Sequence, residues 1–483
     1  MADGETHAAR EKELDDLRRE NARLREEAAK IPKLEGRLAD LERKLEEALK
    51  KLDKALRAQK RQAAPFSKGD PQSDPKPRGR KAGRNYGAKA HRPIPDHVDD
   101  VIPVPLPDRC ECGGDTVLDQ TLPQYQEEIP QKPIVRRFDV AVGHCKDCGR
   151  HVQGRHPLQT SDALGAAAAQ LGPNAQAMTA LLKDKIGVSY GDVETIFRDF
   201  FGLLLSRGGA AQIALRVAER TKAAYRGIEI VVRRSRVVYP DETGWKVGGW
   251  LQWMWVFVTR TATLFKIRDS RGHDVPEEVL GADWSGDMVH DGWMPYDFFK
   301  EADHQQCVGH IQRRCRLMLE GATRGAVRFP RAVLELFGDA FGLRNRRDAG
   351  EVSRHGLAVA IGRLEARLDR LLEWHLSNPT NAKLAGHLGR HRDEFFMFLK
   401  KPWVEATSWP ADQAIRPAVA NRKVFGGNRD PRGAEAQEIL ASIAATCGQR
   451  GVGVFDYLSR VIRATASRRD ALACRLLGVP HTA

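Results

Sequence analysis

The stretch from residue 230 to residue 314 constrains the fold most, because short apolar runs alternate with polar turns in a specific order. Three strands come first, in "RVVYPDETGW" (ending at Asp241), "WLQWMWVFVT" and "TLFKIRDSRG". A helix at "PEEVLG" and a strand at "GDMVHDG", ending in Asp291, come next. A short helix at "PYDFFKEA" and a strand in "HQQCVGHIQRR" that runs into a helix complete the series. The pattern predicts a mixed sheet with helices on its faces.

This order of elements is that of a ribonuclease H-like core, in which the ends of the first and fourth strands are adjacent. We therefore expect Asp241 and Asp291 to be neighbours. Facing carboxylates repel unless a divalent cation lies between them, and oxygen ligands suit Mg²⁺ or Mn²⁺. Two such ions about 3.5–4 Å apart activate an attacking hydroxyl and stabilise the leaving oxygen of a phosphodiester. The alternative is that Asp291 and Gly292 form an ordinary turn.

Residues 10–57 carry a heptad pattern, which predicts a coiled coil and hence a homodimer. Asn21 falls at an a-type position, where a buried Asn favours a parallel pair, and Pro32 predicts a local break. The alternative is a single solvated helix. The heptad positions are Leu14, Leu17, Asn21, Leu24, Ala28 and Ile31, then Leu34, Leu38, Leu41, Leu45, Ala48, Leu52 and Ala55.

Residues 58–95 are rich in Pro, Gly, Lys and Arg and lack apolar periodicity, so they predict a disordered basic linker. The formal net charge of +14 fits a polyanionic partner. The core of this linker resembles arms that insert Arg into narrow minor grooves, although a plain solvated linker is equally compatible. The candidate DNA-contacting residues are Arg78, Arg80, Lys81 and Arg84.

Two cysteine pairs in residues 96–160 predict a zinc ribbon, because paired thiolates beside glycine turns suit tetrahedral Zn²⁺. The expected ligands are Cys110, Cys112, Cys145 and Cys148, with His144 or His156 as a substitute for one thiolate. Four protein ligands leave no open position, so this zinc would be structural. The cysteine usage, the polar N-terminus and the absence of an apolar run of about 18 residues predict a cytoplasmic protein without a membrane segment.

Residues 161–228 have helical periodicity and the outline of a helix-turn-helix. Ser189 and Ser206 are placed to cap two helices, and Phe201-Gly202 supplies the break between them. Either the second helix reads DNA or the pair is ordinary helical packing.

Several motifs, taken in order, resemble transposases of the insertion sequence 66 family. They are "YPDETGWKVGGWLQWMWVFVT", "SRG", "VHDGWMPYDFF", "QQCVGHIQRR" and "AIRPAVANRKVFGGNRDPRGAEAQEILASIAATCGQRGVGVFDYL". The resemblance implies a DDE-type transposase that acts on double-stranded DNA, both transposon ends and target, in the nucleoid. It also implies a ribonuclease H-like core in two parts, residues 229–314 and 406–475, separated by a helical insertion at 315–405.

The resemblance places the third acid at Asp412, in "ADQAIRP", where the family normally has Glu. Asp reaches roughly 1 Å less far, a displacement that matters for rate. Either the backbone compensates or this copy is weakened; Glu435, Glu438 and Glu405 are the substitute acids. The same placement implies phosphate contacts from Arg313, Arg314, Arg416, Arg422 and Lys423.

Three residues keep more than one interpretation. Cys307 and His310 match the family's Cys-x-x-His, which shapes the site, touches DNA or packs in the core. Trp245 either stacks on a base or is buried. The leading function is a metal-dependent transposase; the alternatives are a catalytically weakened or inactive DNA-binding relative and a nuclease on the same core.

Overall fold

The structure is a computed structural model that describes residues 19–25, 30, 32, 35–38, 40–46, 94–105, 107–109, 111–115, 117–126, 133–159, 161–165, 170–321 and 324–481. Internal packing divides the chain into two units, Met1–Gln126 and Glu127–Ala483. Each unit is considered by itself.

In the first unit, the described residues of the heptad region are helical at 19–25, 35–38 and 40–46. The leucines of the predicted stripe that are described are all exposed to solvent: Leu24, Leu38, Leu41 and Leu45. The remaining apolar heptad positions lie outside the described residues. So does the basic linker up to residue 93, including Arg78, Arg80, Lys81 and Arg84. The coiled coil and the basic arm therefore stay predictions.

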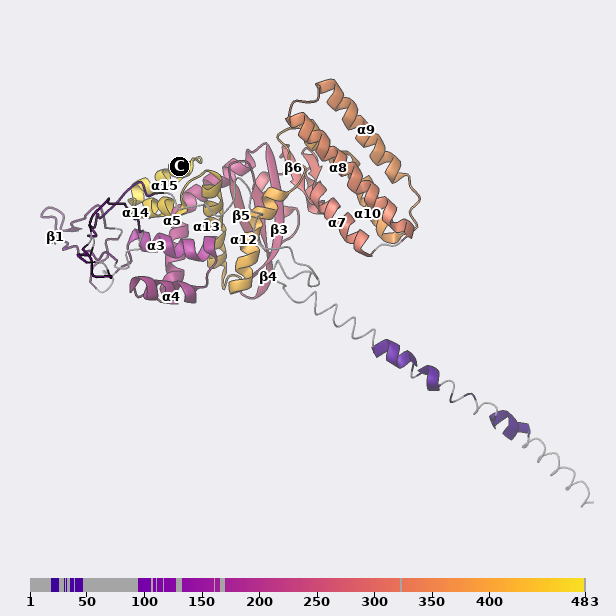
Figure 1. Ribbon diagram of the computed structural model, residues 1–483, viewed down its shortest axis with the longest axis horizontal. Coiled ribbons are helices and arrows are strands. Elements are labelled where there is room, and N and C mark those ends of the chain that lie inside the picture. Colours follow the sequence, from indigo (N-terminus) through magenta and orange to yellow (C-terminus); the bar gives the residue numbers. More distant parts are fainter. Residues whose placement is uncertain are drawn as a thin grey trace, which may run out of the picture. The chain divides into compact units, whose positions relative to one another are not determined.

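The second unit is built on a five-stranded mixed sheet with strand order β5-β4-β3-β6-β7 (Figure 1). The strands are β3 (Val237–Val247), β4 (Trp250–Val258), β5 (Thr263–Arg268), β6 (Asp287–His290) and β7 (Asp303–Gln306). The first three pair antiparallel, while β6 runs parallel to β3 and β7 parallel to β6. The predicted mixed sheet is confirmed, with one difference in the first strand.

The expectation that the first strand ends at Asp241 is wrong, because β3 continues to Val247. The reason lies in the turn that follows, where Gly248 and Gly249 both have positive φ, 60° and 87°. Two such residues form the tight hairpin turn whose twist matches antiparallel strands, and pairing with β4 extends up to it. Asp241 therefore lies within a strand, beyond the last residue that pairs with β6.

Successive residues of the central strands point to opposite faces of the sheet, as the strand period requires. Val238, Trp255 and Met288 enter one hydrophobic cluster, whereas their chain neighbours enter the other: Tyr239, Val256 and Val289. The sheet is thus buried on both faces.

The hydrophobic cluster on the first face includes helices that come before, between and after the strands in the sequence. These are α3 (Pro173–Ala180), α4 (Tyr190–Phe201), α5 (Arg207–Arg233), α6 (Asp274–Leu280), α13 (Pro431–Gln449), α14 (Val454–Arg463) and α15 (Ala466–Leu477). The predicted caps are confirmed. Ser189 accepts from the N–H of Asp192, Gly202 ends α4 with φ 63°, and Ser206 accepts from the N–H of Gly209.

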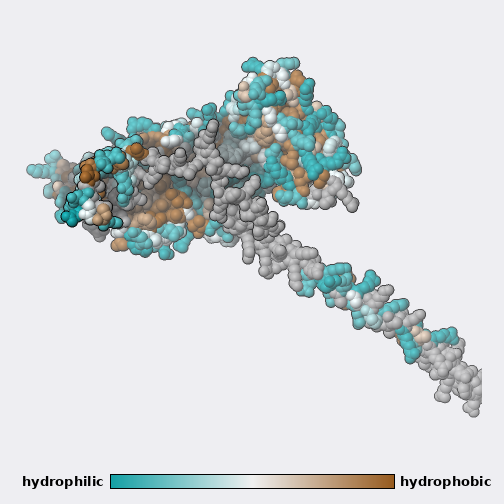
Figure 2. Space-filling view, viewed as in Figure 1, coloured by the Kyte–Doolittle hydropathy of each residue, from teal (hydrophilic) through white to brown (hydrophobic). Residues whose placement is uncertain are grey.

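The hydrophobic cluster on the second face includes residues of the predicted helical insertion and of α12 (Trp409–Phe425), and α12 packs directly on β3 and β4. The helices between β7 and α12 are α7 (Val308–Gly321), α8 (Arg328–Asp348), α9 (Arg354–Leu372), α10 (Pro379–Arg390) and α11 (Met397–Lys400), and the predicted insertion at 315–405 begins within α7. Over these helices, the face seen in Figure 2 carries mostly hydrophilic side chains with scattered apolar ones. None of the described helices is long and apolar enough to cross a membrane.

Helix α13 covers the free edge of the sheet, because its side chains accept hydrogen bonds from the backbone of β5 at regular intervals. Alternate N–H groups of β5, at Thr263, Phe265 and Ile267, donate to side chains one helical turn apart. The acceptors are Thr446, Ser442 and Glu438. Four residues of helix rise about 6 Å and two residues of strand about 6.6 Å, so the two repeats stay in register. An edge that would otherwise pair with another chain is closed.

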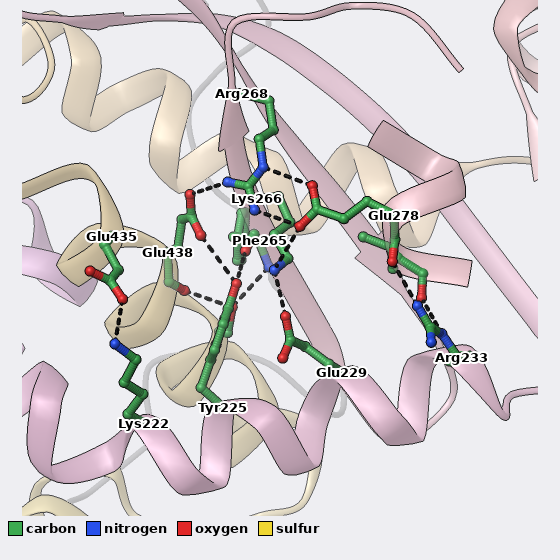
Figure 3. Close-up of polar contacts among 12 residues, drawn as sticks. Lys222, Tyr225, Glu229, Arg233, Phe265, Lys266, Arg268, Glu278, Glu435 and Glu438 are labelled. Atoms are coloured by element: carbon green, nitrogen blue, oxygen red, sulfur yellow. Dashed lines mark hydrogen bonds and ion pairs between the residues drawn. The ribbon is translucent and has the colours of Figure 1, made fainter. Parts of the chain in front are cut away.

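The Glu438 carboxylate also holds a polar network around that edge (Figure 3). Its second oxygen accepts from the Tyr225 hydroxyl at 3.2 Å, and its first also accepts from Arg268 at 2.9 Å. Arg268 in turn forms an ion pair with Glu278, at 2.6 Å. Since every oxygen of Glu438 has a partner, the network is structural.

Candidate active site

Asp241 and Asp291 occupy equivalent positions on neighbouring parallel strands. Val237 pairs with Asp287, and each aspartate lies four positions beyond its member of that pair. Asp291 immediately follows β6 and is exposed, while Asp241 is half-buried. The expected adjacency of these two strand positions is therefore present.

Asp412 approaches from α12, whose first turn contains it. Its backbone N–H donates to the carbonyl of Ser408 at 3.0 Å, so the helix is already regular at this residue. Burial, and then the negative charges of Glu242, Asp291 and Asp412, raise the pKa of Asp241 to about 7. Charges shift a pKa in this way only at short range, so Asp241 lies within electrostatic range of Glu242 and of the other two candidate aspartates.

The chemistry of this group fits a divalent cation, since its members are oxygen donors whose mutual repulsion a cation would relieve. One oxygen of Asp241 accepts from the Glu242 N–H at 2.9 Å, and one of Asp291 accepts from the Trp293 N–H at 3.0 Å. These bonds fix both side chains, and within the part of the chain that the structure describes their other oxygens accept no such bond. No three acidic, His or Cys side chains of the described residues are close enough together to hold a metal ion. Binding a cation therefore requires the carboxylates to draw together.

Cys307 and His310 connect the strand side of the site to the helix that carries Asp412. The Cys307 sulfur is buried and accepts the backbone N–H of Ser408, the residue that precedes α12, at 3.2 Å. The hydrogen bond with Cys307, and further the charges of Asp412 and Asp291, raise the pKa of His310 to about 9. Although burial opposes it, the bond from His310 lowers the pKa of Cys307. The packed-core interpretation of this pair fits.

The loop after β6 is held by a chain of histidines that sequence reasoning missed. The Gly292 N–H donates to His290 Nδ1 at 3.1 Å, and His290 Nε2 lies 3.0 Å from His304 Nδ1. His304 Nε2 donates to the carbonyl of Phe299 at 2.9 Å, which fixes the direction of every proton in the chain. Burial lowers the pKa of His290 to about 3, so its ring is neutral. The sequence does place His290 next to Asp291. A strand pattern, however, does not show which side chains a buried polar residue will contact.

The insertion also reaches this loop. A Cβ at Gly292 would lie 2.5 Å from Gln306 Oε1 and 2.8 Å from the ring of His387, and its φ is +86°. Gln306 donates to Glu394, just after α10, at 2.6 Å. The position of Asp291 therefore depends on residues that belong to the inserted helices.

The candidate phosphate-contacting residues differ in their surroundings. Arg313 and Arg416 are exposed, on α7 and α12 respectively, and Arg314 and Lys423 are partly buried. Arg422 has a structural role, because its guanidinium donates hydrogen bonds to the Gly244 carbonyl and to the Thr243 hydroxyl. We therefore interpret Arg422 as a tie between α12 and β3 rather than a surface contact.

The remaining candidates have other partners in the fold. Glu438 caps the edge of β5, Glu435 is paired with Lys222 at 2.7 Å, and Glu405 lies 3.8 Å from Arg344. Trp245 is fully buried, and its indole N–H donates to Asn428 at 2.6 Å. Burial is therefore the interpretation that fits Trp245.

One of the two predicted cysteine pairs lies on a backbone hairpin of the kind expected for a zinc knuckle. The strands β1 (Val142–His144) and β2 (His151–Gln153) form a hairpin whose tip carries Cys145 and Cys148, with Gly149 at φ 70°. Hydrogen bonds from the backbone of Cys148 and Asp147 lower the pKa of Cys145. Cys112 belongs to the other unit, and Cys110 lies outside the described residues. The four-cysteine site stays a prediction.

The mixed sheet with helices on its faces defines the protein as a member of the α/β class. The family described as "Transposase IS66 family" matches residues 168–436, more than half of the chain. The protein therefore belongs to the IS66 transposase family.

One curated relative, Uncharacterized protein y4jO of Sinorhizobium fredii (strain NBRC 101917 / NGR234), is 24% identical over 160 residues. The match covers 33% of this chain and 48% of the relative, so the chain spans about half of that protein's length.

Proposed function

We propose that this protein is a DNA transposase that cuts transposon ends and joins them to target DNA at Asp241, Asp291 and Asp412. One observation carries the proposal. In a chain of this family, two aspartates in equivalent positions on parallel strands interact electrostatically with a third aspartate on a helix. The strand order, with three antiparallel strands followed by two parallel ones, supports a ribonuclease H-like core.

The three carboxylates would hold Mg²⁺ or Mn²⁺, which supplies activation of the attacking oxygen and stabilisation of the leaving oxygen. In the first step, water attacks phosphorus at the transposon end and the bond from phosphorus to the 3′ oxygen breaks. That oxygen takes up a proton and leaves as a 3′-hydroxyl. The attacking water loses its proton to solvent, and Asp241 would serve as one of the carboxylates that hold the cation.

In the second step, the new 3′-hydroxyl attacks a phosphodiester of the target DNA. One phosphorus–oxygen bond forms for each one that breaks, so the joining needs no external energy source and no covalent bond to the protein. Asp291 and Asp412 hold the reacting groups in line.

The other parts of the chain would supply DNA ends in pairs. We assign residues 10–57 to a dimeric coiled coil, 58–95 to a basic arm and 96–160 to a structural zinc ribbon. Residues 161–228 form the helical region beside the core. Residues 229–314 and 406–475 make up the two parts of the core around the insertion at 315–405. Arg313, Arg314, Arg416 and Lys423 would contact phosphates, which provides salt-dependent affinity without sequence readout.

A catalytically weakened DNA-binding relative is the second candidate, and a specific observation favours it. Asp412 stands where the family normally has the longer Glu, and the described carboxylates are not close enough together for a metal ion. If the helix cannot move inward by roughly 1 Å, catalysis would fall steeply.

Cleavage and joining of the DNA that flanks the coding sequence, assayed with Mg²⁺ and Mn²⁺, tests the proposal. Wild type, Asp291→Asn and Asp412→Glu should be compared. We expect wild type to cut and join, and Asp291→Asn to be inactive. An inert wild type together with an active Asp412→Glu would establish the weakened relative instead. If all three bind DNA and none cuts it, the catalytic proposal is wrong.

A further inference from the structure

Trp409 is a large aromatic side chain left exposed beside the acidic site. It begins α12, three residues before Asp412, and 61% of its surface is exposed to solvent. Packing does not explain it, because the buried residues of this helix lie on another face: Ala411, Ile415, Ala418 and Asn421. A second apolar side chain, Met294, stands three residues after Asp291 and is 65% exposed.

The Trp409 ring is held in a fixed orientation. Gln413, with its amide oxygen facing both donors, accepts from the Trp409 indole Nε1 and from Arg416, each at 3.1 Å. These three residues lie three and four positions apart, so they share one side of the helix. The polar edge of the indole is therefore turned toward the helix, and the exposed remainder of the ring is apolar.

An aromatic face next to a guanidinium is the combination by which proteins hold unpaired nucleotides, with the base on the ring and the phosphate on the cation. Arg416 is exposed and carries the positive charge that this requires. Every base has a flat π-face, so such a contact works without a particular sequence.

We propose that Trp409 is a stacking platform for an unpaired nucleobase next to the phosphodiester that enters the aspartate site, with Arg416 on the adjoining phosphate. This inference rests on the proposed function, since it assumes that DNA occupies the site. It adds that the DNA end is unstacked there, and that Trp409 holds the displaced base.

A binding assay with 2-aminopurine tests the platform without requiring cleavage, because stacking on an aromatic ring quenches its fluorescence. The full-length protein is titrated, without added Mg²⁺ or Mn²⁺, into a duplex with a short single-stranded end that carries 2-aminopurine, and into the same sequence fully paired. The variants are Trp409→Ala and Trp409→Phe. Trp250→Ala is the matched control, since Trp250 is 79% exposed but lies in the hairpin after β3. That hairpin is six residues beyond Asp241, about 20 Å along the strand.

We expect wild type, Trp250→Ala and Trp409→Phe to quench the unpaired base. Trp409→Ala should lose the quenching and bind the single-stranded end roughly 5- to 150-fold more weakly, with little change for the paired duplex. If Trp409→Ala quenches and binds as wild type does, the platform is wrong while the transposase proposal stands. If wild type binds neither DNA, both are wrong.

Discussion

Replacing Asp241 with Asn should stabilise the metal-free protein while destroying its activity. The carboxyl is half-buried beside other negative charges, so its pKa is about 7 in the folded protein against an ordinary 3.8. Between these two values the folded state keeps a proton that the unfolded state has released. Wild type therefore loses stability as the pH rises from about 4 to about 7. The loss is complete above pH 7.

The size of the effect follows from that difference. Each pH unit corresponds to about 1.4 kcal/mol, so the penalty reaches up to about 4 kcal/mol at pH 8 and about 1.5 kcal/mol at pH 5. Asn carries no charge and keeps an oxygen to accept the N–H of Glu242. Asp241→Asn should accordingly be more stable than wild type at both pH values, with a clearly larger margin at pH 8.

Urea unfolding of both proteins in EDTA at pH 5 and pH 8 measures this difference. Asp470→Asn, at an exposed position of α15, controls for the general effect of removing one charge. With excess Mn²⁺, the difference in free energy of unfolding between Asp241→Asn and wild type at pH 8 should shrink or change sign. The reason is that only wild type gains binding energy in the folded state. A margin that is the same at both pH values, or an Asn variant less stable than wild type at pH 8, would refute the electrostatic account of the site.

Three further predictions follow from individual contacts. Ser442→Ala leaves the N–H of Phe265 buried without its acceptor, so the free energy of unfolding should fall by about 1–3 kcal/mol in urea titration, with a tendency to aggregate through the opened edge. Cys307→Ala removes the acceptor of the Ser408 N–H and should cost a similar amount, whereas Cys307→Ser should recover most of it. Gly292→Ala should reduce DNA cleavage by about tenfold or more, because the new Cβ meets neighbouring atoms at 2.5 Å and the loop must shift.

Each of these has an outcome that contradicts it. An unchanged midpoint for Ser442→Ala, relative to Ser467→Ala at an exposed position, would mean that α13 does not close the sheet. Equal loss in Cys307→Ala and Cys307→Ser would assign the effect to packing. For Gly292→Ala, full activity in a folded variant would mean that the loop tolerates a different position.

Periodicity predicted much of the sheet because its strands are buried on both faces or end at polar turns. The "GDMVHDG" run and the strand order were enough to predict Asp291 on the strand next to that of Asp241. The extent of β3 could not be predicted in the same way. Its last residues, including Gly244 and Lys246, have low strand preference, and they pair because the double-glycine turn brings β4 alongside.

The supporting residues of the site were harder to predict, since their roles depend on long-range contacts. Arg422 follows the third acid closely in sequence, which suggested DNA, but the partner it meets is the backbone of β3. Glu438 had the chemistry of a substitute acid, and its helix carries it to the edge of β5 instead. Local patterns give the face of a helix, but they do not tell which surface that face will meet.

Mn²⁺ binding to the full-length protein tests the central claim most directly, namely that Asp241, Asp291 and Asp412 act together as one cation site. The free Mn²⁺ signal in electron paramagnetic resonance can be followed during titration of wild type and single Asp→Asn variants, with Glu438→Gln as the control on α13. We expect wild type and Glu438→Gln to bind alike and each of the three aspartate variants to bind at least about tenfold more weakly. A wild type that binds no Mn²⁺, or an Asp412→Asn variant that binds as tightly as wild type, would contradict the account.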